Sequence, residues 1–287
     1  MSFSRIGLFG KFNDSSVSDA VARVRDFLQQ RNLTVLLGNT TSEEIEGDRL
    51  EDGELGPGDQ IDLAIVVGGD GTMLNVARLL SEHDVPAIGI NLGRLGFLTD
   101  IPLVEVESSL ESILTGGYSL EHRTMLQCDV QNGGETVFSG IALNDIVISK
   151  GNTGRLIEFE IRVNEQFVSQ PRSDGLIIST PTGSTAYALS AGGPIIYPDL
   201  PVICISPICP HTLSNRPIIL DEAAVVRIAS MDIQESPANF ALDGVISHQL
   251  DGSEAISITR ASNKLKLIKI QDFNYFETLH SKLGWRG

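Results

Sequence analysis

The chain has 287 residues, of which 41% are hydrophobic and 20% are charged. This composition is typical of a globular protein with room for two domains, and it excludes an intrinsically disordered chain. Acidic side chains outnumber basic ones by 37 to 21, for a formal net charge of −16, which argues against nucleic acid and membrane as partners because both attract clusters of Lys and Arg.

The first hundred residues alternate strand and helix signals. Apolar runs predict strands at 5–9, 33–37, 61–67 and 85–90, and apolar residues at helical spacing predict helices at 16–30 and 72–80. Alternation of this kind favours an α/β domain with a doubly wound, mostly parallel sheet. The acidic, glycine-rich residues 40–60 are expected to form a surface loop, in which a short helix remains an alternative.

A last helix of this region is predicted to run to Leu114. Asp100 is placed to cap it, Pro102 lies early in its first turn, and Gly116-Gly117 stops it. An α/β domain is therefore expected over residues 1–117.

From Tyr118 onward the pattern becomes mainly β. Asn132-Gly133 marks a hairpin turn, and strands are predicted at 157–163, 176–179, 202–206, 224–229, 238–242 and 255–259. This series predicts an all-β, sandwich-like domain over residues 118–265. Helical spacing returns at 275–283, so residues 266–287 are expected to return to the first domain.

A short glycine turn, Gly68-Gly69-Asp70-Gly71-Thr72, separates the strand at 61–67 from the following helix. Glycines allow a phosphate to approach the backbone closely, and the start of a helix offers N–H groups to an anion. Asp70 can then accept a proton from an attacking hydroxyl or help to hold a divalent cation beside a nucleotide. The alternative is an ordinary tight turn in which Asp70 caps the helix.

Two further stretches carry polar groups in a nucleotide-binding pattern. Residues 172–193 surround a strand with hydroxyls and glycines, and Thr182, Ser184 and Thr185 lie where a short helix can begin. The alternative there is a simple helix cap and turn. Asn144-Asp145 lies within the apolar run 141–148, so this pair either forms a structural hydrogen-bonded pair or faces a ligand.

Taken in order and at their separations, residues 68–72, 91–100, 144–145 and 174–187 resemble those of bacterial NAD kinases, members of the ATP-NAD kinase family. The glycine turn alone is shared with lipid kinases and phosphofructokinases, whereas the run from Asp174 to Tyr187 is much more specific. The resemblance implies Mg-dependent transfer of the ATP γ-phosphoryl group to the 2′-hydroxyl of the adenosine ribose of NAD. NAD is then expected in the cleft between an α/β and a β-rich domain.

The resemblance also implies roles for particular residues. Asp70 would be the general base, and Gly68, Gly69, Gly71 and Thr72 would form the phosphate loop. The implied contacts to NAD are Asp70, Gly71, Phe97, Asn144, Asp145, Arg155, Arg172, Asp174, Thr182, Thr185, Ala186, Tyr187 and Ser190. The cation is expected to bind mainly through the ATP phosphates, since no P-loop sequence is present. The five histidines lack ligand spacing and are expected to be structural or exposed. The family further implies a homodimer or homotetramer, and no role is assigned to Val245.

Two other functions remain open at this stage. A lipid kinase of the diacylglycerol type shares the glycine turn but favours a basic or apolar membrane-facing surface. A noncatalytic dinucleotide-binding regulator would keep the residues around Thr182 while Asp70 served only as a cap. The three cysteines contain no CxxC pair, which argues against a disulfide framework or structural zinc and favours the reducing cytoplasm. Residues 1–10 show no signal sequence, and no apolar stretch approaches the length of a membrane span.

Overall fold

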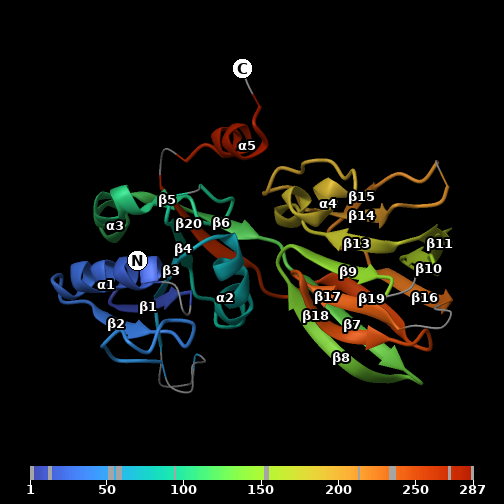
Figure 1. Ribbon diagram of the computed structural model, residues 1–287, viewed down its shortest axis with the longest axis horizontal. Coiled ribbons are helices and arrows are strands. Elements are labelled where there is room, and N and C mark those ends of the chain that lie inside the picture. The colour runs from blue at the N-terminus through green and yellow to red at the C-terminus, as the bar shows by residue number, and fades with distance from the viewer. Residues whose placement is uncertain are drawn as a thin grey trace. The chain divides into compact units, whose positions relative to one another are not determined.

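A computed structural model describes residues 3–11, 15–50, 55, 60–93, 95–151, 155–212, 214–232, 237–270 and 273–285 (Figure 1). The chain divides into two compact units. The first contains Met1–His122 and Leu265–Gly287, and the second contains Arg123–Lys264. No helix in the described ranges is long and apolar enough to span a membrane.

The first unit is built on a mostly parallel sheet. Its strands are β1 (Arg5–Gly10), β2 (Thr34–Leu37), β3 (Leu63–Val67), β4 (Ala87–Asn91), β5 (Ile101–Pro102), β6 (Tyr118–Arg123) and β20 (Leu265–Ile270). They are ordered β2-β1-β3-β4-β20-β6, with β5 paired to β4. The predicted parallel α/β domain is therefore confirmed, although β20 is a strand that the sequence pattern missed.

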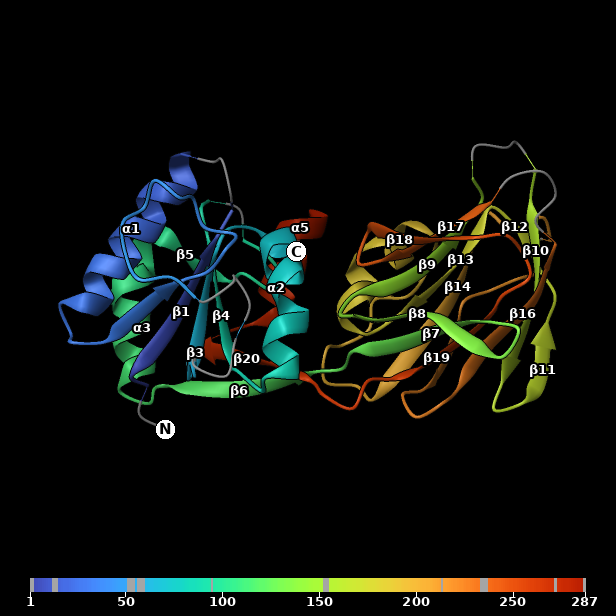
Figure 2. The same ribbon diagram turned by 90° about the horizontal axis from the view of Figure 1, so that it is seen from below.

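Helices cover both faces of this sheet. Figure 2 shows α1 (Ser15–Gln29) and α3 (Val106–Leu114) on one face and α2 (Asp70–Glu82) on the other. The apolar stripe of α1 is buried, including Val17, Val21, Val24 and Leu28, as its helical spacing predicts. The C-terminal helix α5 (Tyr275–Leu283) also belongs to this unit.

The predicted role of Asp100 as a helix cap is wrong. Ile101-Pro102 forms the short strand β5, a 3-10 helix follows at Leu103–Glu105, and Glu105 is the N-cap of α3. Asp100 instead forms a buried ion pair with Lys269 of β20. The sequence Asp-x-Pro is typical of a helix start, but here the ion pair with Lys269 holds the Asp100 side chain away from the helix.

The segment expected as a surface loop at residues 40–60 is more closely packed than predicted. Leu37 and Arg49 form an isolated parallel bridge, and Ile45 and Leu50 are buried. These apolar side chains hold the segment against the sheet. The alternative of a short helix concerns in part residues 51–54 and 56–59, which lie outside the described residues.

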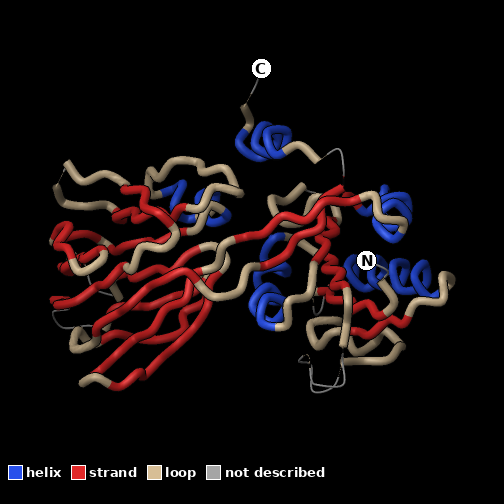
Figure 3. The backbone as a smooth tube through the Cα atoms, turned by 180° about the vertical axis from the view of Figure 1, so that it is seen from behind, coloured by secondary structure: helices blue, strands red, loops and turns tan. Residues whose placement is uncertain are grey.

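The second unit consists of two antiparallel sheets, and Figure 3 shows that strands dominate it. One sheet contains β7 (Leu126–Asn132), β8 (Glu135–Ala142), β10 (Ile157–Val163), β11 (Gln166–Ser169), β12 (Arg172–Ser173), β16 (Val226–Asp232) and β19 (Ala255–Arg260). The other contains β9 (Asp145–Ser149), β13 (Gly175–Ser179), β14 (Val202–Ile208), β15 (Ile218–Asp221), β17 (Ala238–Leu242) and β18 (Val245–Leu250). The predicted all-β architecture is confirmed.

Alternating side chains from both sheets fill one core. In β10, Ile157, Phe159 and Ile161 are buried and pack with residues such as Ile178 and Phe240 of the second sheet. The predicted hairpin joins β7 to β8, and Gly133 supplies the positive φ, 59°, that its turn requires.

Candidate functional site

The glycine turn at residues 68–72 joins β3 to α2. Gly68 has a φ of 152°, and a Cβ there would lie 2.4 Å from Oγ1 of Thr72, so both conformation and space require glycine. A Cβ at Gly69 or Gly71, in contrast, would meet no atom of the described residues within 4 Å. The backbone of this turn is therefore open to a ligand.

A cavity of about 330 Å³ lies beside the turn. Its lining comes from the ends of three neighbouring strands and from α1: Lys11, Val17, Gly68, Gly69, Asn91, Leu92 and Gly93. In the sheet, β1 lies between β2 and β3. The chain leaving β1 therefore continues to one side of the sheet and the chain leaving β3 continues to the other, so the two connections diverge at this edge. Ligands of open α/β sheets bind at such a switch point, outside the carboxyl ends of the strands.

The cavity has the chemistry of an anion site. Lys11 is exposed and brings a positive charge. Gly69 is the N-cap of α2, and no side chain in the described part of the chain caps that helix, so its first N–H groups can serve a ligand. The sequence analysis did not identify Lys11, although a cation directly after a strand of a parallel sheet is a usable signal.

The carboxylate of Asp70 fastens the turn at residues 96–99. Its Oδ1 accepts hydrogen bonds from the Leu98 N–H (3.0 Å), the Thr99 N–H (3.2 Å) and the Thr99 hydroxyl (3.2 Å). Its Oδ2 accepts one from the Phe97 N–H at 3.0 Å. The interpretation of Asp70 as a helix cap is thus wrong, because its side chain serves a different turn.

Phe97 is linked to the C-terminal helix. Its ring centroid lies 6.0 Å from that of Tyr275, which is a buried residue in the first turn of α5. Among the predicted site residues, the first unit therefore brings the glycine turn, Asp70 and Phe97 together, with α5 supporting the aromatic ring.

In the second unit, Asn144 lies in the turn between β8 and β9, and Asp145 is the first residue of β9. The carboxylate of Asp243 accepts hydrogen bonds from the backbone N–H groups of Leu143 (2.8 Å), Asn144 (2.6 Å) and Asp145 (3.2 Å). Sequence reasoning missed this role of Asp243, although an Asp-Gly pair in a hairpin is a recognisable signal.

The same turn contacts the hydroxyl-rich segment after β13. The Thr180 hydroxyl donates to the Leu143 carbonyl at 2.6 Å, and the Thr180 N–H donates to the Asn144 carbonyl at 2.9 Å. A Cβ at Gly183 would lie 2.0 Å from the Asn144 oxygen. Glycine at 183 is therefore needed for the two predicted segments to meet.

Asp145 is buried, Asp243 is half-buried, and the two carboxyl groups are close enough to influence each other. Burial raises the pKa of Asp145 to about 7, and the Asp243 charge adds to the rise. Burial also raises the pKa of Asp243, although the three backbone N–H groups oppose that effect. Near neutral pH Asp145 therefore exists in both protonated and ionised forms, and it can donate or accept a hydrogen bond.

The predicted short helix after β13 is present as a 3-10 helix at Thr182–Thr185, followed by α4 (Tyr187–Ser190). Ser184 has a structural role, since its hydroxyl donates to the Pro181 carbonyl (2.6 Å) and accepts from the Ile196 N–H (3.0 Å). Exposure then increases along the segment: Thr182 is buried, Thr185 and Ala186 are half-buried, and Tyr187 and Ser190 are exposed.

Charged residues lie on the flanks of this segment. Asp174 pairs with Lys150, a residue that the sequence analysis missed, at 2.6 Å. Arg172 is exposed and lies 3.5 Å from Glu158, and Arg155 is also exposed. The Asp174 carboxylate is thus paired with Lys150 of the same unit. The side chains of Arg155 and Arg172 are accessible to an anionic ligand.

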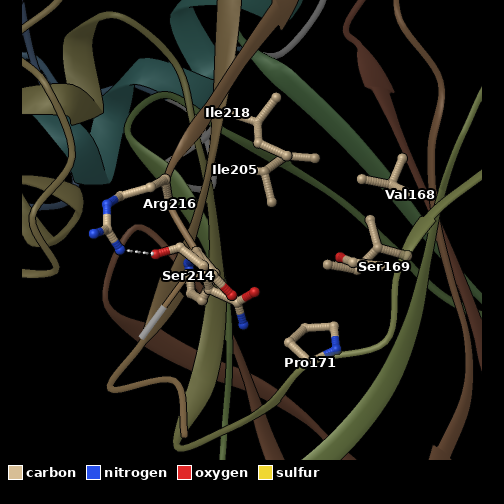
Figure 4. Close-up of a pocket in the computed structure, with 10 residues that line it drawn as sticks. Val168, Ser169, Pro171, Ile205, Ser214, Arg216 and Ile218 are labelled. Atoms are coloured by element: carbon tan, nitrogen blue, oxygen red, sulfur yellow. Dashed lines mark hydrogen bonds between the residues drawn. The ribbon is translucent and has the colours of Figure 1, made fainter. Parts of the chain in front are cut away.

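A second cavity, of about 250 Å³, lies in the second unit (Figure 4). Its walls are largely apolar, with Val168, Ile205 and Ile218 among the lining residues, and Arg216 donates a hydrogen bond to the Asn215 carbonyl at 2.8 Å. None of the predicted site residues lines it. This cavity is separate from the glycine turn and from the Asn144 turn.

Comparisons of the sequence agree with the expected family. The profile of the ATP-NAD kinase N-terminal domain matches residues 6–118, and that of the ATP-NAD kinase C-terminal domain matches residues 143–270. The NAD kinase of Nitrosospira multiformis is 43% identical over 287 residues, which is 100% of this chain and 97% of the relative. The NAD kinase of Pseudomonas entomophila is 44% identical over 285 residues, 99% of this chain and 96% of the relative.

Solved structures give the same result. The crystal structure of yeast NADH kinase complexed with NADH matches with a TM-score of 0.87 at 25% identity, covering 100% of this chain and 89% of the other. An NAD kinase from Archaeoglobus fulgidus in complex with ATP matches with a TM-score of 0.76 at 26% identity, covering 99% and 100% of the two chains. The chain therefore belongs to the ATP-NAD kinase family of phosphotransferases.

Proposed function

We propose that this protein transfers the γ-phosphoryl group of ATP to the 2′-hydroxyl of the adenosine ribose of NAD, which yields NADP and ADP. One observation carries the proposal: the carboxylate of Asp70 is fixed beside an open glycine turn, at the switch-point edge of a parallel sheet. Phosphoryl transfer depends mainly on positioning and electrostatics, which are the properties of this arrangement.

The triphosphate is proposed to bind at the cavity lined by Lys11, Gly68 and Gly69. The N–H groups at the start of α2 and the Lys11 ammonium would share the negative charge, and Gly71 and Thr72 would complete the loop. Backbone donors and a single lysine would here replace the P-loop sequence that the chain lacks.

Asp70 is proposed to orient the ribose hydroxyl and to accept its proton. Its Oδ1 is occupied by donors from Leu98 and Thr99, which fix the plane of the carboxylate. Among the described residues, its Oδ2 receives one bond, from Phe97, so a lone pair of this oxygen is suited to the hydroxyl. A carboxylate held in this way can remove a proton as the P–O bond forms.

We further propose how the other predicted residues contact NAD. Asn144 and Asp145 would bond ribose hydroxyls, Asp174 would lie on the nicotinamide side, and Arg155 and Arg172 would contact the diphosphate. Gly71 and Phe97 would line the site, and Thr182, Thr185, Ala186, Tyr187 and Ser190 would surround an adenosine or nicotinamide portion. The increase in exposure from Thr182 to Tyr187 supports a surface that binds a flat, polar ligand.

A divalent cation is proposed to enter with ATP. In the described ranges, no group of three or more His, Cys, Asp or Glu side chains could hold a metal ion, and Oδ1 of Asp70 is already occupied by protein donors. The donor set therefore fits Mg²⁺ carried mainly by the phosphates. When bound, this ion would neutralise charge on the transferring group.

The protein is also proposed to form a homodimer or homotetramer in the cytoplasm. Exposed apolar side chains on edge strands of the second unit support association: Phe167 on β11, Ile218 and Ile219 on β15, and Val245 and Ile246 on β18. Cys128, Cys204 and Cys209 are free thiols, in keeping with a reducing compartment.

The test compares acceptors on the purified chain with ATP and Mg²⁺. We expect phosphorylation of NAD, detected with an NADP-specific dehydrogenase and assigned to the 2′ position by ³¹P NMR. Phosphorylation of diacylglycerol alone would contradict the proposal and favour a lipid kinase. NAD binding without transfer to any acceptor would favour a noncatalytic regulator.

A further inference from the structure

Lys269 and Asp100 form an ion pair in the interior of the first unit. The Nζ of Lys269 lies 2.9 Å from Oδ2 of Asp100, and the side chains are 2% and 3% exposed. Lys269 also lies 4.2 Å from the ring centroid of Phe273. At 2% exposure the ammonium does not reach a ligand, so any role in the reaction acts through other residues.

The pair is poorly suited to stability alone. Oδ1 of Asp100 is buried and receives no hydrogen bond from the described residues. Burial raises the pKa of Asp100 even though Lys269 opposes the rise. A buried ion pair with an unsatisfied oxygen is often no more stabilising than well-packed apolar residues. Its contribution is therefore to be sought in the position of the backbone that it holds.

Asp100 directly follows the residues that bind Asp70. The N–H and the hydroxyl of Thr99 donate to Oδ1 of Asp70, and the Thr99 carbonyl accepts from the Gly96 N–H (2.9 Å) and from Nδ2 of Asn91 (3.1 Å). Asp70 of the glycine turn thus holds residues 97–99 of this turn. Asp100, the next residue, connects the turn to β20 through Lys269.

The anchor on β20 is a buried strand of the parallel sheet. In Figure 2, β20 lies beside β4, and the two strands are parallel with Leu267 opposite Ala87. Leu267 and Ile268 are buried in the core. Lys269 follows them toward the carboxyl end of the strand, the same edge of the sheet at which the glycine turn lies.

We propose that Lys269 is a positioning residue for phosphoryl transfer, which holds Asp100, and through it the turn at 96–99, so that the Asp70 carboxylate faces the acceptor hydroxyl. This inference rests on the proposed role of Asp70. A misplacement on the order of 1 Å in a catalytic group can lower a rate by about 100-fold, so a fixed anchor matters for this reaction.

The test replaces both charges, because a single substitution leaves a buried charge unpaired. Asp100→Leu/Lys269→Met should fold, since an apolar pair often replaces a buried ion pair without loss of stability. We expect kcat for NADP formation to fall about tenfold or more, with KM for NAD changed by less than about threefold. Hydrogen exchange measured by mass spectrometry should become faster in peptides covering residues 96–100.

The same strand offers a matched control. Lys266 of β20 pairs with Asp84 at 2.6 Å, but the Asp84 side chain is 74% exposed. Lys266→Met should leave kcat and the exchange of residues 96–100 unchanged. If the apolar pair does not fold, Asp100→Asn/Lys269→Met, which preserves the shape of Asp100, is judged by the same two measurements.

A folded double variant with wild-type kcat and unchanged exchange at 96–100 would overturn the positioning role. Failure of the Asp70 assignment is recognised separately, by full activity of Asp70→Asn. In that case faster exchange at 96–100 in the double variant would still show that Lys269 positions this turn.

Discussion

A Cβ on Gly96 would lie 2.1 Å from Oδ1 of Asp70 and 2.4 Å from Oγ1 of Thr99. The turn and the carboxylate therefore fit together only with glycine at 96. Because Asp70 is held by four hydrogen bonds, it cannot move away without losing its orientation.

Gly96→Ala should therefore lower kcat by about tenfold or more, since displacement of the carboxylate disturbs its alignment with the acceptor. Gly117→Ala is the matched control, because the nearest atom to its Cβ would be the Ser112 hydroxyl oxygen at 2.4 Å, which can rotate away, and the next would be the Ser112 carbonyl oxygen at 3.1 Å. Steady-state kinetics and melting temperature of both variants decide the matter. An active, stable Gly96→Ala enzyme would show that the close contact has no catalytic importance.

Lys11→Met should raise KM for ATP by about tenfold, because it removes a positive charge from the cavity at the glycine turn while keeping most of the side-chain volume. KM for NAD should change much less. Lys282→Met, on the exposed surface of α5, serves as the control for loss of one positive charge. Equal effects on the two substrates would argue against a phosphate contact.

Asp145→Asn should change how stability depends on pH. The pKa of Asp145 rises from 3.8 to about 7 in the folded protein, chiefly through burial, so the protonated form favours folding. That contribution is complete below pH 3.8 and is lost as pH rises through about 7. Asparagine does not ionise. The free energy of unfolding of the variant, relative to that of the wild type, should therefore rise by about 1–3 kcal/mol as the pH is raised from 5 to 8.

Urea unfolding at the two pH values measures this difference, with the exposed Asp199→Asn as control. A stability difference between Asp145→Asn and the wild type that stays constant with pH would mean that the folded protein does not suppress ionisation of Asp145.

Glu222→Gln should lower the free energy of unfolding by about 1–3 kcal/mol at neutral pH. The carboxylate accepts hydrogen bonds from Thr124 (2.6 Å), Arg260 (2.8 Å) and Lys264 (3.3 Å), and its side chain is 9% exposed. Burial opposes ionisation, but these partners outweigh it and lower the pKa below its usual 4.5. The stabilisation is therefore present above pH 4.5 and is lost as pH falls through the lowered pKa.

Denaturant unfolding at neutral and acidic pH checks both the size and the sign of this effect. Glu165→Gln breaks an exposed ion pair with Arg227 and should cost less than about 0.5 kcal/mol. Equal losses in the two variants would contradict the importance of the buried network.

The sequence predicted correctly those helices and strands whose conformation follows from the pattern of apolar residues within the segment itself. The apolar spacing of α1 and the alternation in β10 each reflect one buried face, so their type was readable from the sequence. The glycine turn was placed correctly between β3 and α2 because its conformational requirement, at Gly68, is also local.

Long-range partners account for what could not be predicted. Asp100 carries the local features of a helix cap, yet its partner Lys269 lies 169 residues away in the sequence. The turn at Asn144 similarly depends on Asp243, 99 residues away. Asp70 was identified from its motif, but its donors at residues 97–99 belong to a different turn, so their geometry required the structure.

The central claim is that Asp70 acts on the ribose hydroxyl, and Asp70→Asn tests it most directly. NADP formation and the dissociation constant of NAD are measured on the same preparation, with Thr99→Val as the control that removes one hydrogen bond but keeps the carboxylate. We predict that Asp70→Asn lowers kcat by about 100-fold or more while the NAD dissociation constant changes by less than about threefold. Wild-type kcat in a folded Asp70→Asn enzyme would contradict the account.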